Sequence, residues 1–264
     1  MELSPLLKQY YELRAQVQAQ AEGALLFFRM GDFYELFGDD AVEASRLLEL
    51  TLTSRDRNKP NPLPMAGVPH HSAQGYIQKL LKMGKKVAIG EQVEDPSKVT
   101  GKNIVKREIV RIFSPGVQYD LEGSEANYLA CIIEDSSRTE AQWLLACLDA
   151  STGEALVGDP MDSASLAQEL GGLPIRQLLR FPSTNKDKDE EALPPGALPQ
   201  GLLSEVLPLN YLSASQAEEL LKRHYEVASL DAFLPSAPAT QALGVLVHYV
   251  LRSQKQERLE YLRL

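Results

Sequence analysis

The spacing of hydrophobic residues predicts the first elements of the chain. Over residues 4–21 they recur every three or four positions, which is typical of an amphipathic helix. Residues 24–30, ALLFFRM, are a short run rich in aromatic residues, the pattern of a buried strand. Gly31 and Asp32 suit a two-residue hairpin turn, after which FYELF returns as a second strand.

Mixed helical and strand patterns continue to residue 117. They predict helices over residues 41–50 and 71–82, and strands at residues 50–55, 87–93 and 104–113. Asp39 or Asp40 is expected to cap the first of these helices by accepting hydrogen bonds from its free amides. Residues 1–117 are therefore predicted to form one α+β domain with a mixed sheet, followed by a polar linker over residues 118–127.

A second arrangement, in which strands alternate with helices, begins at residue 128. Strands are expected at residues 128–135, 143–149 and 175–181, and helices over residues 163–173, 213–226 and 241–263. This alternation favours an α/β domain with a partly parallel sheet over residues 128–237. The last helix has no glycine or proline terminator, so the chain is expected to stop inside a longer helix.

The composition excludes several classes of protein. No hydrophobic run approaches the roughly 20 residues that cross a bilayer, and the N-terminus lacks the pattern of a signal peptide. Cys131 and Cys147 each lie in a hydrophobic run and are expected to be buried free thiols. The chain contains no GxxxxGK[ST] phosphate loop. These features predict a cytoplasmic protein with no metal, no cofactor and no membrane partner.

The net charge of -9 disfavours a nucleic-acid partner until its distribution is considered. Residues 1–120 hold 16 Lys and Arg against 15 Asp and Glu, whereas the other 144 residues hold 11 against 21. Between Arg55 and Arg111 there are 12 basic and 5 acidic residues. Phosphate binding requires a basic surface and not a basic protein, so this segment is compatible with DNA or RNA, although an ordinary solvated surface also explains it.

Residues 33–37, FYELF, pose the sharpest question about function. In an extended strand Phe33, Glu35 and Phe37 share one face. If that face is core, Phe33 completes the hydrophobic core and Glu35 pairs with a surface lysine, because an unpaired buried carboxylate is costly. If it is exposed, Phe33 can enter a base stack and Glu35 can hydrogen-bond a base edge. The pattern alone leaves both interpretations open.

Four motifs resemble one family. FFRMGDFYELF, LPMAGVPHH (residues 63–71), VAIGEQVEDP (87–96) and VKREIVRIFSPGV (105–117) occur in the order and spacing of the N-terminal domain of MutS, the DNA mismatch recognition protein. The likeness covers residues 5–117. The following residues resemble, more weakly, the family's ribonuclease-H-like α/β connector, and residues 238–264 its first core or lever helix. The family's clamp and ATPase domain, with ATP and magnesium, have no counterpart in this sequence.

The resemblance implies roles for Phe33 and Glu35. The family's Phe-x-Glu motif meets the mismatch from the minor groove, so Phe33 is expected to stack on a mispaired base and Glu35 to hydrogen-bond it. A mismatched step is weakly stacked and easily kinked, so a wedge enters it at a lower cost than paired DNA. Stacking is indifferent to the base. The two residues would therefore detect deformability and not sequence.

The resemblance also implies weaker DNA contacts. Met30 is expected to flank the wedge, Arg55 and Arg107 to contact the DNA backbone, and Pro69 and His70 to approach the minor groove. For His70 and its neighbour His71, a structural role at the start of the next helix is an equal alternative. The family usually has an aromatic residue where this chain has His70.

Four carboxylates of the connector half resemble a catalytic set. Glu134, Asp135, Asp149 and Glu154 lie near the place where ribonuclease-H-like nucleases carry catalytic aspartates, and two-metal catalysis needs several converging carboxylates. The family's connector is not a nuclease, and a polar turn between strands explains these residues equally well. No catalytic or metal-binding residue is therefore predicted.

The resemblance implies that the connector relays signals between DNA and ATPase and contacts a MutL-type partner.

The sequence thus predicts a DNA mismatch repair fragment that binds mismatched or unpaired bases and has no enzymatic activity of its own. The full-length protein is expected to be a homodimer close to the nucleoid, and this fragment a monomer. The alternative is a free-standing interaction module that has lost DNA recognition and binds repair partners through the connector.

Overall fold

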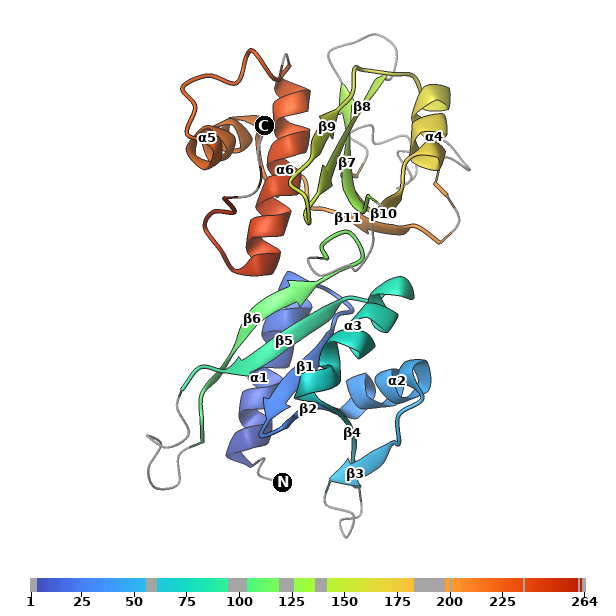
Figure 1. Cartoon of the computed structure of the whole chain (residues 1–264), viewed down its shortest axis with the longest axis vertical. Coiled ribbons are helices and arrows are strands. Elements are labelled where there is room, and N and C mark those ends of the chain that lie inside the picture. The colour runs from blue at the N-terminus through green and yellow to red at the C-terminus, as the bar shows by residue number, and fades with distance from the viewer. Residues whose placement is uncertain are drawn as a thin grey trace. The chain divides into compact units, whose positions relative to one another are not determined.

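The computed structural model describes residues 4–55, 61–94, 104–118, 126–135, 142–182, 198–199, 201–234, 236–260 and 262. Two compact units make up the chain, Met1–Ser114 and Pro115–Leu264, and Figure 1 shows the elements of each. The first unit thus ends three residues before the expected boundary at residue 117.

The first unit is built on a six-stranded sheet with the order β3-β4-β2-β1-β5-β6. Strands β1 and β5 are parallel, and every other neighbouring pair is antiparallel, so the predicted mixed sheet is confirmed. The strands are β1 (Leu25–Met30), β2 (Phe33–Phe37), β3 (Thr53–Arg55), β4 (Leu63–Pro69), β5 (Val87–Gln92) and β6 (Arg107–Phe113).

Helices cover both faces of this sheet (Figure 1). Helix α1 (Pro5–Gln20) packs on the face to which Leu26 and Phe28 point. On the other face, α2 (Gly38–Leu48) and α3 (Ala73–Lys82) pack against Leu25 and Phe27, and the short helix η1 (His70–Ser72) leads into α3. Strand β1 is hydrophobic at successive positions because both of its faces are covered.

The start of α2 differs from the prediction. The helix begins at Gly38, and no side chain caps its first turn, which contains Asp39 and Asp40. Gly38 has a φ of +60°, a backbone conformation that favours glycine, and this turns the chain directly from β2 into the helix. Asp40 is consequently free to bind elsewhere, and it lies buried against α1 and β1.

The second unit contains a five-stranded sheet with the order β11-β10-β7-β8-β9. Strands β11, β10 and β7 are parallel, while β7, β8 and β9 are antiparallel, which confirms the predicted partly parallel sheet. The strands are β7 (Tyr128–Asp135), β8 (Gln142–Asp149), β9 (Ala155–Val157), β10 (Ile175–Arg180) and β11 (Leu203–Val206). Helix α4 (Ser163–Gly172) packs on one face, and α5 (Ala214–Tyr225) and α6 (Ala237–Gln254) on the other.

Helix α6 lies in the core of this unit. We expected residues 238–264 to begin a separate core region, but α6 packs against α5, β7 and β8 because almost all of its surface is hydrophobic. The helix ends at Gln254, where Lys255 takes a left-handed conformation with a φ of 54°, so the charged residues that follow do not prolong it.

Two further expectations, about the cysteines and about membrane-spanning helices, can be compared with the structure. Cys131 and Cys147 are free and buried, as predicted, and they point to opposite faces of the sheet. Among the described residues, no helix is long and hydrophobic enough to span a bilayer.

Candidate nucleic-acid interface

The β1–β2 hairpin places Phe33 beside its turn. Met30 and Phe33 are register partners across the hairpin, and Gly31 supplies the positive φ of +56° that so tight a turn requires. On its other side Phe33 pairs with Pro69 at the end of β4. The structure thus brings together Met30, Phe33 and Pro69, three residues that the sequence assigned to one site.

His70 holds the tip of this hairpin. Its amide donates a hydrogen bond of 2.9 Å to the carbonyl oxygen of Asp32, and its Nδ1 lies 3.2 Å from the same oxygen. Asp32 is the second residue of the turn. In the structure His70 thus bonds the turn and also begins η1, the start of the next helical segment. The expected DNA contact of His70 stays a prediction.

Phe33, Glu35 and Phe37 share one face of β2, but helix α1 covers only one end of that face. At that end Phe37 is 2% exposed, and its ring meets that of Tyr10 edge-on at 4.9 Å. At the hairpin end Phe33 is 47% exposed and belongs to none of the described hydrophobic clusters. Phe33 therefore does not complete the hydrophobic core.

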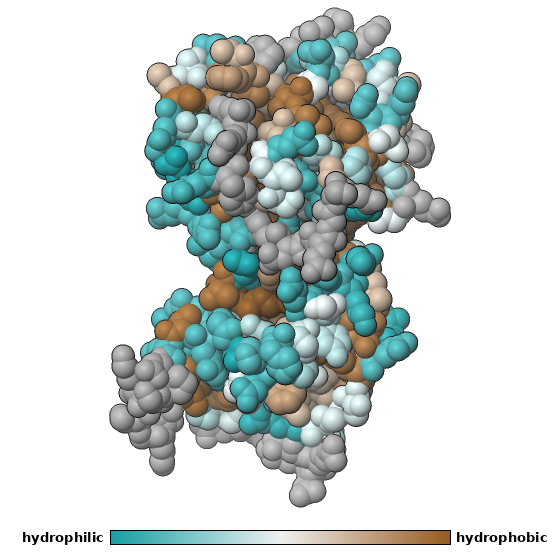
Figure 2. Space-filling view, viewed as in Figure 1, coloured by the Kyte–Doolittle hydropathy of each residue, from teal (hydrophilic) through white to brown (hydrophobic). Residues whose placement is uncertain are grey.

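Exposure alone does not identify a binding residue. Other large hydrophobic side chains reach the surface, including Tyr11 at 42% and Phe233 at 56%, and hydrophobic residues are visible on both units in Figure 2. Phe33 differs from them in its setting. It lies at a hairpin tip, two positions before Glu35, whose side chain points to the same face of the strand.

Glu35 is half-buried and incompletely satisfied. Its register partners are Phe28 on β1 and Gly67 on β4. Its Oε2 is shielded from solvent and has no hydrogen-bond partner among the described residues. Burial raises the pKa of Glu35, while the positive charges of Arg55 and Arg107 act in the opposite direction. The electrostatic neighbours of Glu35 are thus arginines and not the expected surface lysine.

Arg107 is bonded by other groups of the protein. It is 7% exposed, and its guanidinium lies 4.9 Å from the centre of the Phe28 ring. Its Nε donates to the carbonyl oxygen of Arg29 at 2.6 Å, and its Nη1 donates to Val105 O at 2.8 Å and to Gln9 Oε1 at 3.0 Å. These bonds use three of the five N–H groups of Arg107, so it supports the hairpin from behind. The expected contact with the DNA backbone stays a prediction.

Arg55 is the more accessible of the two arginines. It ends β3 at the edge of the sheet and is partly exposed, with its guanidinium 5.9 Å from the centre of the Phe37 ring. This leaves Arg55 close to the face of Glu35 and Phe33 and able to meet a phosphate. Several other basic residues between Arg55 and Arg111, at positions 57, 59, 98 and 102, lie outside the described residues.

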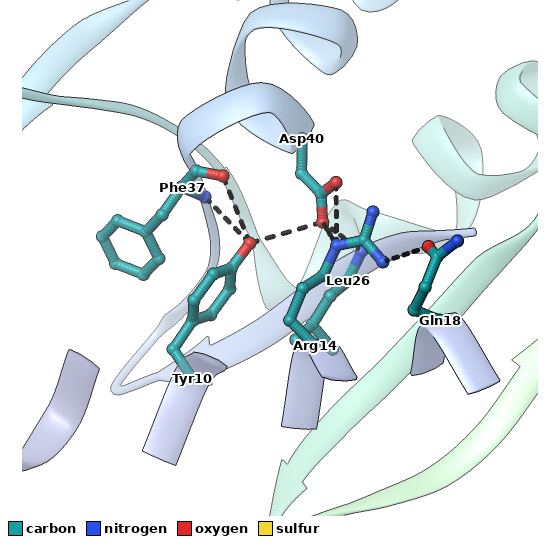
Figure 3. A network of polar contacts seen from close by, with 6 residues as sticks. All are labelled: Tyr10, Arg14, Gln18, Leu26, Phe37 and Asp40. Carbon is teal, nitrogen blue, oxygen red and sulfur yellow. Dashed lines mark hydrogen bonds and ion pairs between the residues drawn. The ribbon is translucent and has the colours of Figure 1, made fainter. Parts of the chain in front are cut away.

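A buried polar network ties α1 to the end of β2 (Figure 3). The Tyr10 hydroxyl lies 3.2 Å from the carbonyl oxygen of Phe37 and 3.3 Å from Oδ2 of Asp40, and it accepts from the Phe37 amide at 3.4 Å. Asp40 also accepts from the Leu26 amide at 3.0 Å and from Arg14 Nε at 3.1 Å. Burial raises the pKa of Asp40, and these bonds oppose that shift.

The carboxylates of the connector half do not form a catalytic cluster. Asp149 is 2% exposed; its Oδ1 accepts from Ser151 and its Oδ2 accepts from the Asn127 amide, so it stabilises a turn. Asp149 pairs with Tyr128 at the start of β7, whereas Glu134 and Asp135 lie at the far end of that strand. Within the described part of the chain, no group of three or more His, Cys, Asp or Glu could hold a metal ion.

Comparison with known proteins identifies the family. A family model described as MutS domain I matches residues 4–122, and one described as MutS domain II matches residues 127–263. The chain belongs to the MutS family. Both matches agree with the resemblance of residues 5–117 and of the residues from 128 onward.

Individual MutS relatives match along most of the chain. The DNA mismatch repair protein MutS of Desulfatibacillum aliphaticivorans is 37% identical over 260 residues, which are 97% of this chain and 28% of that protein. Those of Streptococcus pyogenes serotype M5 and Streptococcus suis are 45% identical over 258 residues and 47% identical over 179 residues. These matches cover 97% and 67% of this chain, and 27% and 20% of the relatives. The chain spans about a quarter of the length of most of these MutS relatives.

Three features of the site could not be read from the sequence. The inward orientation of Arg107 depends on the distant partners Gln9 and Arg29. The network of Tyr10 and Asp40 joins residues 30 positions apart. The position of Gly67 opposite Glu35 follows only from the pairing of β2 with β4.

Proposed function

We propose that residues 1–114 of this chain recognise mismatched or unpaired bases in duplex DNA, as the mismatch-reading part of a larger MutS protein. One observation carries the proposal. On one face of β2, the exposed ring of Phe33 lies beside Glu35, whose Oε2 has no hydrogen-bond partner among the described residues. Phe33 enters the weakened base step from the minor groove, and Glu35 then meets a donor on the displaced base.

Discrimination follows from the difference between paired and mispaired DNA. In a regular duplex Phe33 must unstack a stable step, and the Glu35 carboxylate is brought close to phosphates that repel it. In a mismatched step the cost of unstacking is lower, and a base edge becomes available to Glu35. Arg55 offsets part of the repulsion by meeting a backbone phosphate, a contact that carries no sequence information.

The second unit serves as the connector of that larger protein. It relays DNA binding to an ATPase and offers a surface to a MutL-type partner, in a cytoplasmic homodimer associated with the nucleoid. Its described carboxylates do not converge as two-metal catalysis requires, because Asp149 stabilises a turn and Glu134 and Asp135 lie at the far end of β7. A free-standing interaction module without DNA recognition would have no use for an exposed Phe33 next to an unsatisfied Glu35.

Binding to matched and mismatched DNA tests the proposal. Because a monomeric fragment is expected to bind weakly, a full-length MutS whose N-terminal part is replaced by this chain is titrated with fluorescent duplexes. The duplexes are identical except for a central matched pair, a G·T mismatch or one unpaired thymine. Tighter binding to both altered duplexes supports the proposal, and equal binding to all three overturns it in favour of the interaction module.

A further inference from the structure

Gly67 lies directly beside Glu35 on the exposed part of the sheet. The two residues are register partners in the antiparallel pair of β2 and β4, so a side chain at position 67 would point to the same face as Glu35. A Cβ added at Gly67 would lie 3.6 Å from Cγ of Glu35 and 3.3 Å from the carbonyl oxygen of Tyr34. Gly67 itself is exposed to solvent.

Neither backbone conformation nor core packing explains this glycine. Gly67 lacks the positive φ that would exclude other residues, and glycine in the middle of a strand costs stability relative to residues with a side chain. Gly90, on the same row of the sheet, has a packing reason, because a Cβ there would meet the side chains of Leu26, Leu13 and Phe28 beneath α1. Gly67 is exposed, and the one tight contact that an added Cβ would make is with the carbonyl oxygen of Tyr34 at 3.3 Å.

The row across the sheet shows which groups flank Glu35. Glu35 is flanked on one side by the fully buried ring of Phe28 and on the other by Gly67. The charged Arg107 lies on the Phe28 side, where protein groups already bond it. The exposed side of Gly67 is therefore the side from which another molecule can approach Glu35, whose Oε2 is itself shielded from solvent.

We propose that Gly67 is a specificity-determining residue, which leaves the opening through which a displaced base edge reaches Glu35. The inference rests on the proposed function and adds a residue of a second strand, β4, to the site. The absence of a side chain at position 67 is as necessary for discrimination as the carboxylate of Glu35. A methyl group at this position covers the carboxylate on the side of Gly67. A larger β-branched side chain closes the opening.

Substitution of Gly67 tests this role in the full-length protein that carries this chain. Gly67→Ala is expected to lower the ratio of mismatch to homoduplex affinity about tenfold, the loss of one hydrogen bond to a charged group. Gly67→Val is expected to remove the preference that depends on Glu35. Gly75→Ala is the control, because Gly75 lies in α3 of the same unit and an added Cβ there meets nothing within 4 Å.

The decisive comparison uses the Glu35→Ala background, which has no side-chain acceptor. If Gly67 acts by admitting a base to the carboxylate, adding Gly67→Ala to Glu35→Ala produces a much smaller loss than it does in the wild type. An equal loss in both backgrounds, or an equal weakening of matched and mismatched duplexes, would show that Gly67 only lets the DNA backbone approach, and would overturn the proposal. Unchanged discrimination in Gly67→Val would also overturn it.

Thermal melting separates this role from a folding defect. The variants at position 67 are expected to melt within a few degrees of the wild type, because the backbone conformation suits side chains and a shift of a few tenths of an ångström relieves the contact of the new Cβ with the Tyr34 carbonyl oxygen. A large drop in melting temperature that accounts for the lost binding would count against the proposal. If the unsubstituted protein shows no mismatch preference, the proposed function itself fails, a result that is distinct from a failure of Gly67 alone.

Discussion

Phe33 and Phe37 lie at opposite ends of one strand and point to the same face, yet Phe33 is 47% exposed and Phe37 is 2% exposed. The difference arises because α1 lies over the Phe37 end, where Tyr10 contacts the Phe37 ring. The same strand therefore contributes one aromatic ring to the core and presents another to solvent.

The two phenylalanines predict opposite outcomes for the same substitution. Phe37→Ala should destabilise the first unit by about 3–5 kcal/mol, as removal of a buried phenylalanine does. Phe33→Ala should leave the melting temperature nearly unchanged and remove about 1–3 kcal/mol of mismatch binding by loss of base stacking. Calorimetry and duplex titration on both variants provide the comparison. A melting temperature for Phe33→Ala as low as that of Phe37→Ala would contradict the surface role of Phe33.

Glu35→Gln is expected to increase affinity for matched DNA while reducing discrimination, because it removes a charge that phosphates repel. Burial raises the pKa of Glu35, so the folded protein holds this proton at a pH where the unfolded chain has lost it. The resulting stability is present below about pH 4.5 and is lost as pH rises through the folded pKa. Glu35→Gln should therefore match or exceed the wild type in stability at neutral pH.

Binding as a function of pH isolates this carboxylate. Homoduplex affinity of the wild type should rise toward that of Glu35→Gln as the pH is lowered toward the raised pKa of Glu35, because protonation removes the same charge. The variant serves as the control for every other group that titrates. If the difference in homoduplex affinity between the two proteins stays constant as the pH is lowered to the limit at which both remain folded, a raised pKa of Glu35 in the bound state is contradicted.

The two arginines near Glu35 should also respond differently to alanine. Arg55→Ala should weaken binding to all duplexes alike. It should also lower the slope of log affinity against log salt concentration by about one, the contribution of one phosphate contact. Arg107→Ala should instead destabilise the fold by about 1.5–3 kcal/mol, since its guanidinium bonds three groups of the protein. Melting curves and salt titrations distinguish them. An unchanged melting temperature for Arg107→Ala together with a lower salt slope would contradict this structural role and support a phosphate contact by Arg107.

Much of the fold follows from local patterns. The hairpin from Leu25 to Phe37 was predictable because the hydrophobic run, the Gly-Asp turn and the returning strand are contiguous in sequence. The mixed and partly parallel sheets followed from the order of helices and strands. The pattern also correctly placed Phe33, Glu35 and Phe37 on one face, although it could not say how far a helix covers that face.

The remaining features depend on contacts between distant segments. Asp39 or Asp40 was predicted to cap α2, but the Tyr10 hydroxyl and the Leu26 amide bind Asp40 in the interior. The resemblance to the family implied a backbone contact for Arg107, while its three partners come from α1, from β1 and from the chain just before β6. Charge and residue type alone cannot show whether a side chain faces DNA or the protein interior.

Tyr10→Phe tests whether the buried network positions the wedge strand. The substitution keeps the ring that packs on Phe37 and deletes only the hydroxyl, which lies within hydrogen-bond distance of both Phe37 and Asp40. It should destabilise the first unit by about 1–2 kcal/mol, because the one hydroxyl proton can no longer be donated to the Phe37 carbonyl oxygen or to Asp40. Tyr11→Phe is the matched control, since Tyr11 is 42% exposed on the same helix and this substitution should change stability by less than about 0.5 kcal/mol.

Hydrogen exchange of the β2 amides measures the local effect of the Tyr10 hydroxyl. Faster exchange is expected in Tyr10→Phe alone. Equal exchange in both variants would show that the hydroxyl does not hold β2 in place.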